Sequence, residues 1–113
     1  DSRFGYGQGL YRQKMTNVRI SSAALADLDD AFWFYEAQER GLGEYFAIHL
    51  RADIEGLKVT GGIHRQVHRD LHRALSRKFP YAIFYRYSGG AVLVVAVLDC
   101  RRDPDWIRDR LND

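Results

Sequence analysis

The stretch YAIFYRYSGGAVLVVAVLD, residues 81–99, decides the fold class because it contains two strand patterns joined by a turn. Its first half alternates, so a strand would place four of its apolar and aromatic residues on one face: Tyr81, Ile83, Tyr85 and Tyr87. Ser88-Gly89-Gly90 is typical of a tight hairpin turn. Residues 91–99 are apolar on both faces, as in a strand covered on both sides. The stretch therefore predicts a β-hairpin whose second arm is the central strand of a sheet.

A third strand is predicted just before this hairpin. RALSRKF, residues 73–79, alternates in the same way and would place four residues on one face: Arg73, Leu75, Arg77 and Phe79. Pro80 permits a turn, or begins the next strand. The three segments together predict a small antiparallel sheet.

The preceding half of the chain has a helical period instead. Apolar residues recur at steps of three and four in two segments, residues 23–40 and about 44–59: Leu25, Leu28, Phe32 and Tyr35, then Phe46, Leu50, Ile54 and Leu57. Ser21 or Ser22 can cap the first helix, and Gly41-Leu42-Gly43 separates the two. Two amphipathic helices joined by so short a turn predict a helical hairpin.

Short elements are predicted at both ends. NVRIS, residues 17–21, reads as a strand, and DPDWIRDRL, residues 103–111, begins with an acid and a proline as a helix often does. The expected fold class is α+β: an N-terminal strand and a helical hairpin packed on a small antiparallel sheet, with a short C-terminal helix. Residues 15–113 are expected to form a single domain. We interpret residues 1–14 as a leader, or as a remnant of expression.

The charge of the chain is unevenly distributed. The net charge is only +2, but residues 16–62 carry four basic and eight acidic residues, whereas residues 63–102 carry eight basic and two acidic residues. A basic half of this kind indicates an acidic or polyanionic partner. The alternative is a basic surface that is merely solvated.

Cysteine content and hydropathy indicate the compartment. Cys100 is the only cysteine in the sequence, so the chain can form no internal disulfide, which is consistent with a reducing cytoplasm. No apolar run approaches the ~20 residues that cross a bilayer. We therefore expect a cytoplasmic protein with no membrane partner.

The segment HRQVHRDLHRAL, residues 64–75, carries histidines and arginines at regular spacing. His64, His68 and His72 could share a metal on a helix, but the segment runs into a strand pattern and no carboxylate completes a site. We expect no metal and no cofactor. On a strand the arginines would project from the face opposite to the histidines, and together they could bind phosphates or an acidic peptide. These arginines are Arg65, Arg69, Arg73 and Arg77. A solvated strand edge is the alternative.

The segment LDCRRDPDW, residues 98–106, places two basic residues where the long apolar strand ends. Arg101 and Arg102 would be held rigidly there while remaining exposed, which suits binding or catalysis. Asp103 and Asp105 can pair with them. Trp106 is interpreted as a lid over the sheet. Cys100 is interpreted as a structural thiol because it lies at a strand terminus, the alternative being a thiol made reactive by Arg101 and Arg102. The sequence contains no G-x-S-x-G motif and no P-loop.

Three stretches resemble the RelE/ParE family of toxins from bacterial type II toxin–antitoxin systems, also called plasmid stabilization proteins. They are VRISSAALADLDDAFWFYEAQERGLGEYF (18–46), RALSRKFPYAIFYRY (73–87) and VVAVLDCRRDPDWIRDR (94–110). The resemblance implies a compact α+β toxin held inactive by a cognate antitoxin, whose extended segment wraps the sheet and the hairpin. It also implies a toxin–antitoxin hetero-oligomer.

The resemblance leaves two modes of action open. RelE-like members cut mRNA on the ribosome without a metal, with the help of basic residues and a tyrosine, whereas ParE-like members poison DNA gyrase. The RelE pattern is retained here at Arg73, Arg101 and Arg102. It is lost at three positions, which hold Ala82, Leu75 and Arg108 instead of an arginine, a lysine and a tyrosine. General acid–base assistance contributes ~10²–10⁴-fold, so these losses disfavour RNA cleavage.

Three functions are therefore expected in order. The first is a ParE-like toxin that inhibits gyrase by binding and is not an enzyme. The second is a RelE-like ribonuclease acting on ribosome-bound mRNA, for which the candidate catalytic residues are Arg101, Arg102, Tyr85 and Arg73. The third is a basic binding module or a decayed toxin. The predicted surface for the antitoxin or the target is Arg69, Arg73, Arg77, Lys78, Arg86, Arg101 and Arg102.

Overall fold

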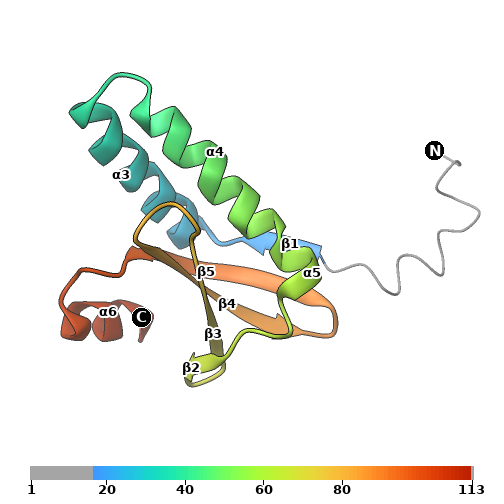
Figure 1. The fold of residues 1–113 in the computed structure, drawn as a ribbon. Helices are drawn as coiled ribbons and strands as arrows, with labels where there is room; N and C mark the ends of the chain where they lie inside the picture. The colour runs from blue at the N-terminus through green and yellow to red at the C-terminus, as the bar shows by residue number, and fades with distance from the viewer. Residues whose placement is uncertain (1–16, 113) are drawn as a thin grey trace, which may run out of the picture.

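The computed structural model describes residues 17–112, which form an α+β fold around one five-stranded sheet (Figure 1). The strands lie in the order β1-β5-β4-β3-β2. Their bounds are β1 Asn17–Ile20, β2 Gln66–His68, β3 Leu71–Leu75, β4 Tyr81–Ser88 and β5 Ala91–Asp99. This confirms the expected fold class. The leader predicted for residues 1–14 lies outside the described residues.

The β4–β5 hairpin forms where the sequence predicts it. Ser88 pairs with Ala91 across the turn, and both turn residues have a left-handed backbone, with φ of 56° at Gly89 and 78° at Gly90. Only residues that tolerate positive φ fit such a two-residue turn, which explains the glycine pair. The prediction that β5 is the central strand is wrong, because β4 holds that position and β5 lies between β4 and β1.

Strand β1 makes the sheet mixed rather than wholly antiparallel. It pairs with β5 in parallel, from Asn17 opposite Ala91 to Ile20 opposite Val94. The remaining pairs are antiparallel, as expected. Since β1 adds to the far side of β5, it covers the first part of that strand's edge, up to Val94. Strand β5 is buried on both faces only over residues 96–98, whereas Ala91 and Leu93 are exposed.

The strand predicted for residues 73–79 ends early, at Leu75. Beyond it the backbone turns toward the second helix, where Asp53 accepts hydrogen bonds from the Ser76 hydroxyl (2.7 Å) and the Arg77 N–H (3.3 Å). The Ser76 N–H still bonds to the Tyr81 carbonyl oxygen of β4 (2.8 Å), and the bonds to Asp53 then draw Arg77 out of line with Arg73. The short strand β2 was not predicted. The turn between β2 and β3 contains Arg69 with φ of 54°.

The helices are α3 Ser22–Gln38, α4 Leu42–Glu55, the single turn α5 Leu57–Thr60, and α6 Pro104–Leu111. Helices α3 and α4 form the predicted hairpin, and the Ser21 hydroxyl caps α3 by accepting from the Ala24 N–H. The apolar face predicted for the second helix is buried, although the helix breaks at Gly56. The face predicted for the first helix is partly wrong. Its buried residues are Ala24, Ala31 and Tyr35, whereas Leu25 is 53% exposed.

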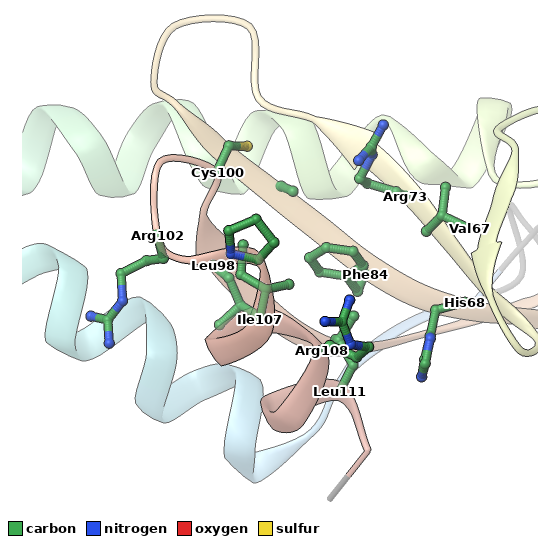
Figure 2. Close-up of a pocket in the computed structure, with 12 residues that line it drawn as sticks. Val67, His68, Arg73, Phe84, Leu98, Cys100, Arg102, Ile107, Arg108 and Leu111 are labelled. Atoms are coloured by element: carbon green, nitrogen blue, oxygen red, sulfur yellow. The ribbon is translucent and has the colours of Figure 1, made fainter.

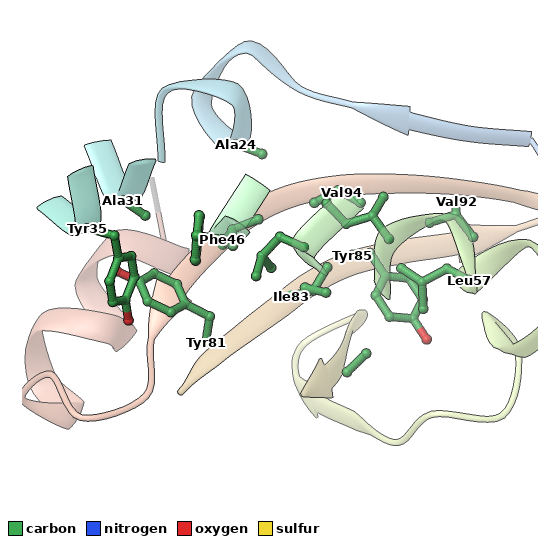
Figure 3. Close-up of a cluster of buried hydrophobic side chains, with 14 residues drawn as sticks. Ala24, Ala31, Tyr35, Phe46, Leu57, Tyr81, Ile83, Tyr85, Val92 and Val94 are labelled. Carbon is green, nitrogen blue, oxygen red and sulfur yellow. The ribbon is translucent and has the colours of Figure 1, made fainter. Parts of the chain in front are cut away.

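Both faces of the sheet carry apolar side chains. The larger core lies between the sheet and the helical hairpin, where the rings of Tyr35, Phe46 and Tyr81 pack together (Figure 3). A smaller cluster lies on the opposite face, and we call it the apolar strip: Ala82, Phe84, Ala96 and Leu98. Helix α6 covers the strip with Ile107 and Leu111. Within residues 17–112 no helix has the length and hydropathy of a membrane span.

Candidate functional site

A groove of about 320 Å³ lies between α6 and the face of the sheet that carries the apolar strip (Figure 2). Ala82, Phe84 and Leu98 form its floor, and Ile107 and Leu111 form its α6 wall. Three basic residues and four others complete the lining: Arg73, Arg102, Arg108, His68, Cys100, Val67 and Pro104. The groove is therefore apolar inside and basic at its rim. We call it the α6 groove.

The basic residues of the α6 groove come from three different elements. Arg73 lies in β3 opposite Phe84 of β4, so its side chain stands on the same face as the apolar strip. Arg108 projects from α6 below Phe84, and its guanidinium bonds to the exposed carboxylate of Asp105 one turn earlier. Such an exposed pair is weak and leaves Arg108 able to exchange partners.

Arg102 is held at the mouth of the groove by Trp106. Its guanidinium carbon lies 3.6 Å from the centre of the Trp106 ring, and the head group points away from Arg73 and Arg108 (Figure 2). Stacking on the ring uses the face of the guanidinium and leaves its N–H edge available. Trp106 is therefore a platform for Arg102. Its predicted role as a lid over the sheet is wrong, since Trp106 is 38% exposed.

Arg101 is bound to its own neighbour. Its Nε and Nη2 donate to the two carboxylate oxygens of Asp99, at 3.0 and 2.7 Å. These hydrogen bonds hold the pKa of Asp99 below its ordinary value. The predicted pairing of Arg101 and Arg102 with Asp103 and Asp105 is wrong, because Asp103 caps α6 and Asp105 binds Arg108. The two arginines thus differ: Arg101 is neutralised locally and Arg102 has no carboxylate partner among the described residues.

The predicted row of four arginines does not form. Arg69 lies in the tight β2–β3 turn and Arg77 in the loop after β3, so only Arg73 of the row stands in a strand. Lys78 is exposed in the same loop as Arg77. Arg86 lies near the far end of β4, where it pairs with Asp70 at 3.1 Å. The predicted binding residues are therefore spread over the sheet rather than aligned.

Tyr85 lies away from the arginines. Its side chain is fully buried in the core under the helices, and its hydroxyl donates to the carbonyl oxygen of Gly61 at 2.7 Å (Figure 3). Burial raises the pKa of Tyr85 to about 12. The structure therefore does not bring Tyr85 together with Arg73, Arg101 and Arg102.

The histidines and the cysteine have structural surroundings. The Nδ1 of His72 lies 2.7 Å from the His64 carbonyl oxygen, and the His72 ring stacks on Tyr85. His68 bonds to Asn112. Partial burial raises the pKa of the Cys100 thiol, and the nearby Arg73 only partly opposes this. A raised pKa keeps the thiol protonated and unreactive at neutral pH.

Arg108 lines the α6 groove but was not predicted from the sequence to be a binding residue. Position 108 drew attention there only because the RelE pattern has a tyrosine at this position. The signal is present in the spacing of the C-terminal helix, because Ile107 and Leu111 lie four residues apart and face the sheet. A basic residue directly after Ile107 then falls at the border between the buried and the exposed side of the helix.

Comparisons with known proteins agree with this architecture. A search of curated proteins finds no match. A chain of the solved structure titled "Chromosomal ParDE TA system from P. aeruginosa" is similar in fold, with a TM-score of 0.65 and 15% sequence identity. The match covers 74% of this chain and 95% of that chain.

The sequence also matches the family described as "ParE toxin of type II toxin-antitoxin system, parDE" over residues 18–104. The matched segment runs from β1 to the first residue of α6 and so includes the whole sheet and the helical hairpin. The family implies an antitoxin as partner. The chain therefore belongs to the ParE toxin family of type II toxin–antitoxin systems.

Proposed function

We propose that this protein is a cytoplasmic toxin that inhibits DNA gyrase by binding and is neutralised by a cognate antitoxin. The observation that carries the proposal is the α6 groove, an apolar floor with a basic rim and without a convergent set of acid and base groups among the described residues. Such a surface suits a protein partner, because apolar area supplies affinity and charge supplies orientation and partner choice.

The arrangement of the side chains favours binding over RNA cleavage. A ribonuclease needs its proton-transfer groups within hydrogen-bond reach of one phosphate. Tyr85 is buried on the other face of the sheet, and Arg101 is neutralised by Asp99. Arg73 and Arg102 remain, and their head groups point in different directions (Figure 2). These positions do not converge on a single reacting phosphate.

The antitoxin is proposed to cover the basic rim with an acidic segment. Arg73 and Arg102 have no carboxylate partner among the described residues, and Arg108 has only the exposed Asp105. Charge-assisted bonds from these side chains to partner carboxylates are stronger than neutral ones. Arg69, Arg77, Lys78 and Arg86 would extend the positive field around this contact and speed association.

The test is induced expression in a bacterial host, with growth, total mRNA and gyrase-dependent DNA breaks followed after induction. We expect growth arrest with intact mRNA and accumulated breaks. Co-expression of the cognate antitoxin, to be sought in a short reading frame next to this gene, should restore growth. Arrest with cleaved mRNA would instead support the ribonuclease. No arrest in hosts with a sensitive gyrase would support a binding module or a decayed toxin.

The basic rim can be tested separately with a double variant. Arg73→Ala with Arg102→Ala should weaken antitoxin binding by about tenfold or more, because two charge-assisted contacts are lost. Arg40→Ala with Arg51→Ala removes the same charge from the helical hairpin and is the matched control. Equal antitoxin affinities for the two double variants, measured by calorimetry, would count against the α6 groove as the contact surface.

A further inference from the structure

Helix α6 is attached to the rest of the fold unusually lightly. None of its eight residues is fully buried. Its backbone makes no extensive contact with any other element of the described chain. Open clefts lie on both sides of it: the α6 groove of about 320 Å³ toward the sheet, and a second cleft of about 540 Å³ toward α3, lined by Phe34, Tyr81 and Trp106. Within the described residues, the apolar packing of the helix on the sheet is confined to Ile107 and Leu111.

One partly buried ion pair joins α6 to the fold. Nη2 of Arg110 donates to Oδ2 of Asp27 at 2.6 Å, and the two side chains are only 22% and 14% exposed. The same nitrogen reaches the carbonyl oxygen of Ala23 at 3.4 Å. Both acceptors belong to α3, so the pair connects the last turn of α6 to the first half of α3.

Asp27 has a second bond that belongs to the sheet. Its Oδ2 also accepts from the backbone N–H of Val97 at 3.0 Å. Strand β1 stops opposite Val94, so the edge of β5 is open beyond that point and Asp27 takes the place of a missing strand. One carboxylate thus completes the edge of β5 and binds α6, and the two roles can be separated by mutation.

The other contacts of α6 are weaker. Ile107 and Leu111 pack against the apolar strip, but both remain partly exposed. The bond between His68 and Asn112 (2.8 Å) lies at the surface. The stacking of Arg102 on Trp106 lies between α6 and the segment directly before it, so it does not join α6 to the sheet.

We propose that α6 is a lid over the apolar strip and that the Asp27–Arg110 pair is its latch. The lid opens as a unit while the five strands and the helical hairpin stay folded. Opening uncovers Ala82, Phe84, Ala96 and Leu98 and joins the two flanking clefts into one continuous surface.

Hydrogen exchange of the full-length protein tests the latch. Asp27→Asn keeps a carbonyl oxygen for the Val97 N–H but loses the ion pair, and Arg110→Gln leaves Asp27 intact. In both variants we expect exchange of the α6 amides to speed up by about tenfold or more, since a largely desolvated charge contact is removed. Amides of β4 and β5 should exchange at their original rates, except Val97 in Asp27→Asn, whose N–H bonds directly to the altered side chain. Arg108→Gln, in the same helix but paired only with exposed Asp105, should change nothing.

A fluorescent apolar dye provides a second reading. Binding of anilinonaphthalene sulfonate should rise in Asp27→Asn and Arg110→Gln, while the unfolding midpoint of Arg110→Gln changes little. Unchanged α6 exchange in both latch variants would overturn the proposal. So would a proportional loss of protection in β5, because the pair would then support the whole fold rather than the lid.

Discussion

Gly43 is the residue on which the close approach of the two long helices depends. A Cβ at this position would lie 2.7 Å from the carbonyl oxygen of Phe32 in α3. The Gly43 N–H also donates to the Glu36 side chain, which caps the start of α4. We expect Gly43→Ala to destabilise the protein by about 1–3 kcal/mol, because the helices must separate to accept the methyl group. Chemical denaturation measures this change.

Gly56 is the matched control for Gly43. It also lies in helical backbone, with φ of −61°, but its nearest contact for an added Cβ is at 3.4 Å. Gly56→Ala should be neutral or should stabilise by ~0.4–1 kcal/mol through the unfolded chain. If the two variants lost the same stability, close helix packing at Gly43 would not be the cause.

Tyr85 supports the core through one hydrogen bond. Removing its hydroxyl in Tyr85→Phe leaves the Gly61 carbonyl without its 2.7 Å donor, which should cost about 1–2 kcal/mol at neutral pH. Tyr45→Phe, at a residue 44% exposed, is the control and should be close to neutral. Urea denaturation at pH 7 compares the two. A neutral Tyr85→Phe would show that the carbonyl finds another donor.

The same tyrosine makes stability depend on alkaline pH. The folded-state pKa of Tyr85 is raised from 10.0 to about 12, so the folded state holds its proton more tightly than the unfolded state. The stability from this group is complete below pH 10 and is lost as the pH rises toward 12. The pKa of Tyr81 is raised to about 12 as well. Burial also raises the pKa of Tyr35. Stability measured from about pH 9 to 12 should therefore fall less steeply in Tyr85→Phe than in the parent protein, with Tyr81 and Tyr35 contributing to the remaining slope.

At the scale of the elements, the β4–β5 turn sets the register of the sheet. Gly89 has φ of 56°, and a Cβ added there would meet no atom within 4 Å, so only the backbone restricts substitution. Gly89→Val should cost about 1–2 kcal/mol, since a β-branched residue avoids this region. Gly89→Asn should be tolerated, because asparagine is common in such turns. Thermal unfolding of both variants checks this, and equal losses would mean that side-chain size matters more than backbone conformation.

The sequence predicts best the elements in which the apolar pattern repeats several times. The faces of α4 and β4 repeat over several turns or residues, and the structure buries Phe46, Leu50 and Ile83 accordingly. Strand β2 has three residues and a register shift, so it has no period to detect. Strand β3 ends at Leu75 because the following loop bonds to Asp53 of α4. The alternation of apolar and polar residues along β3 carries no information about this distant partner.

The candidate site was predictable in its residue types but not in its pairings. The sequence marks Arg101 and Arg102 as equivalent neighbours, yet Asp99 neutralises the first and Trp106 supports the second. Which of two adjacent side chains turns toward a carboxylate depends on the backbone after β5. The ion pair between Asp27 and Arg110 joins residues 83 positions apart in the sequence. It could not be predicted without the positions of α3 and α6 in space.

At the scale of the whole molecule, the two halves of the chain differ in charge and form different layers. The acidic half supplies the helical hairpin, and the basic half supplies most of the sheet and the rim of the α6 groove. We expect the association rate with an acidic antitoxin to fall several-fold between low salt and physiological salt, where the Debye length shortens to ~8 Å. Stopped-flow measurements across ionic strengths test this, and a flat profile would exclude steering by the basic half.

The parallel pairing of β1 with β5 has a consequence for synthesis of the chain. Asn17 pairs with Ala91, so β1 cannot pair with β5 until the ribosome has added 74 further residues (91 − 17). The helical hairpin can form early, but its apolar face has no sheet to cover until β4 and β5 have left the ribosome. Contacts of such long sequence separation slow folding. Strand β5 lies between β1 and β4, so a chain released before β5 cannot complete the five-stranded sheet.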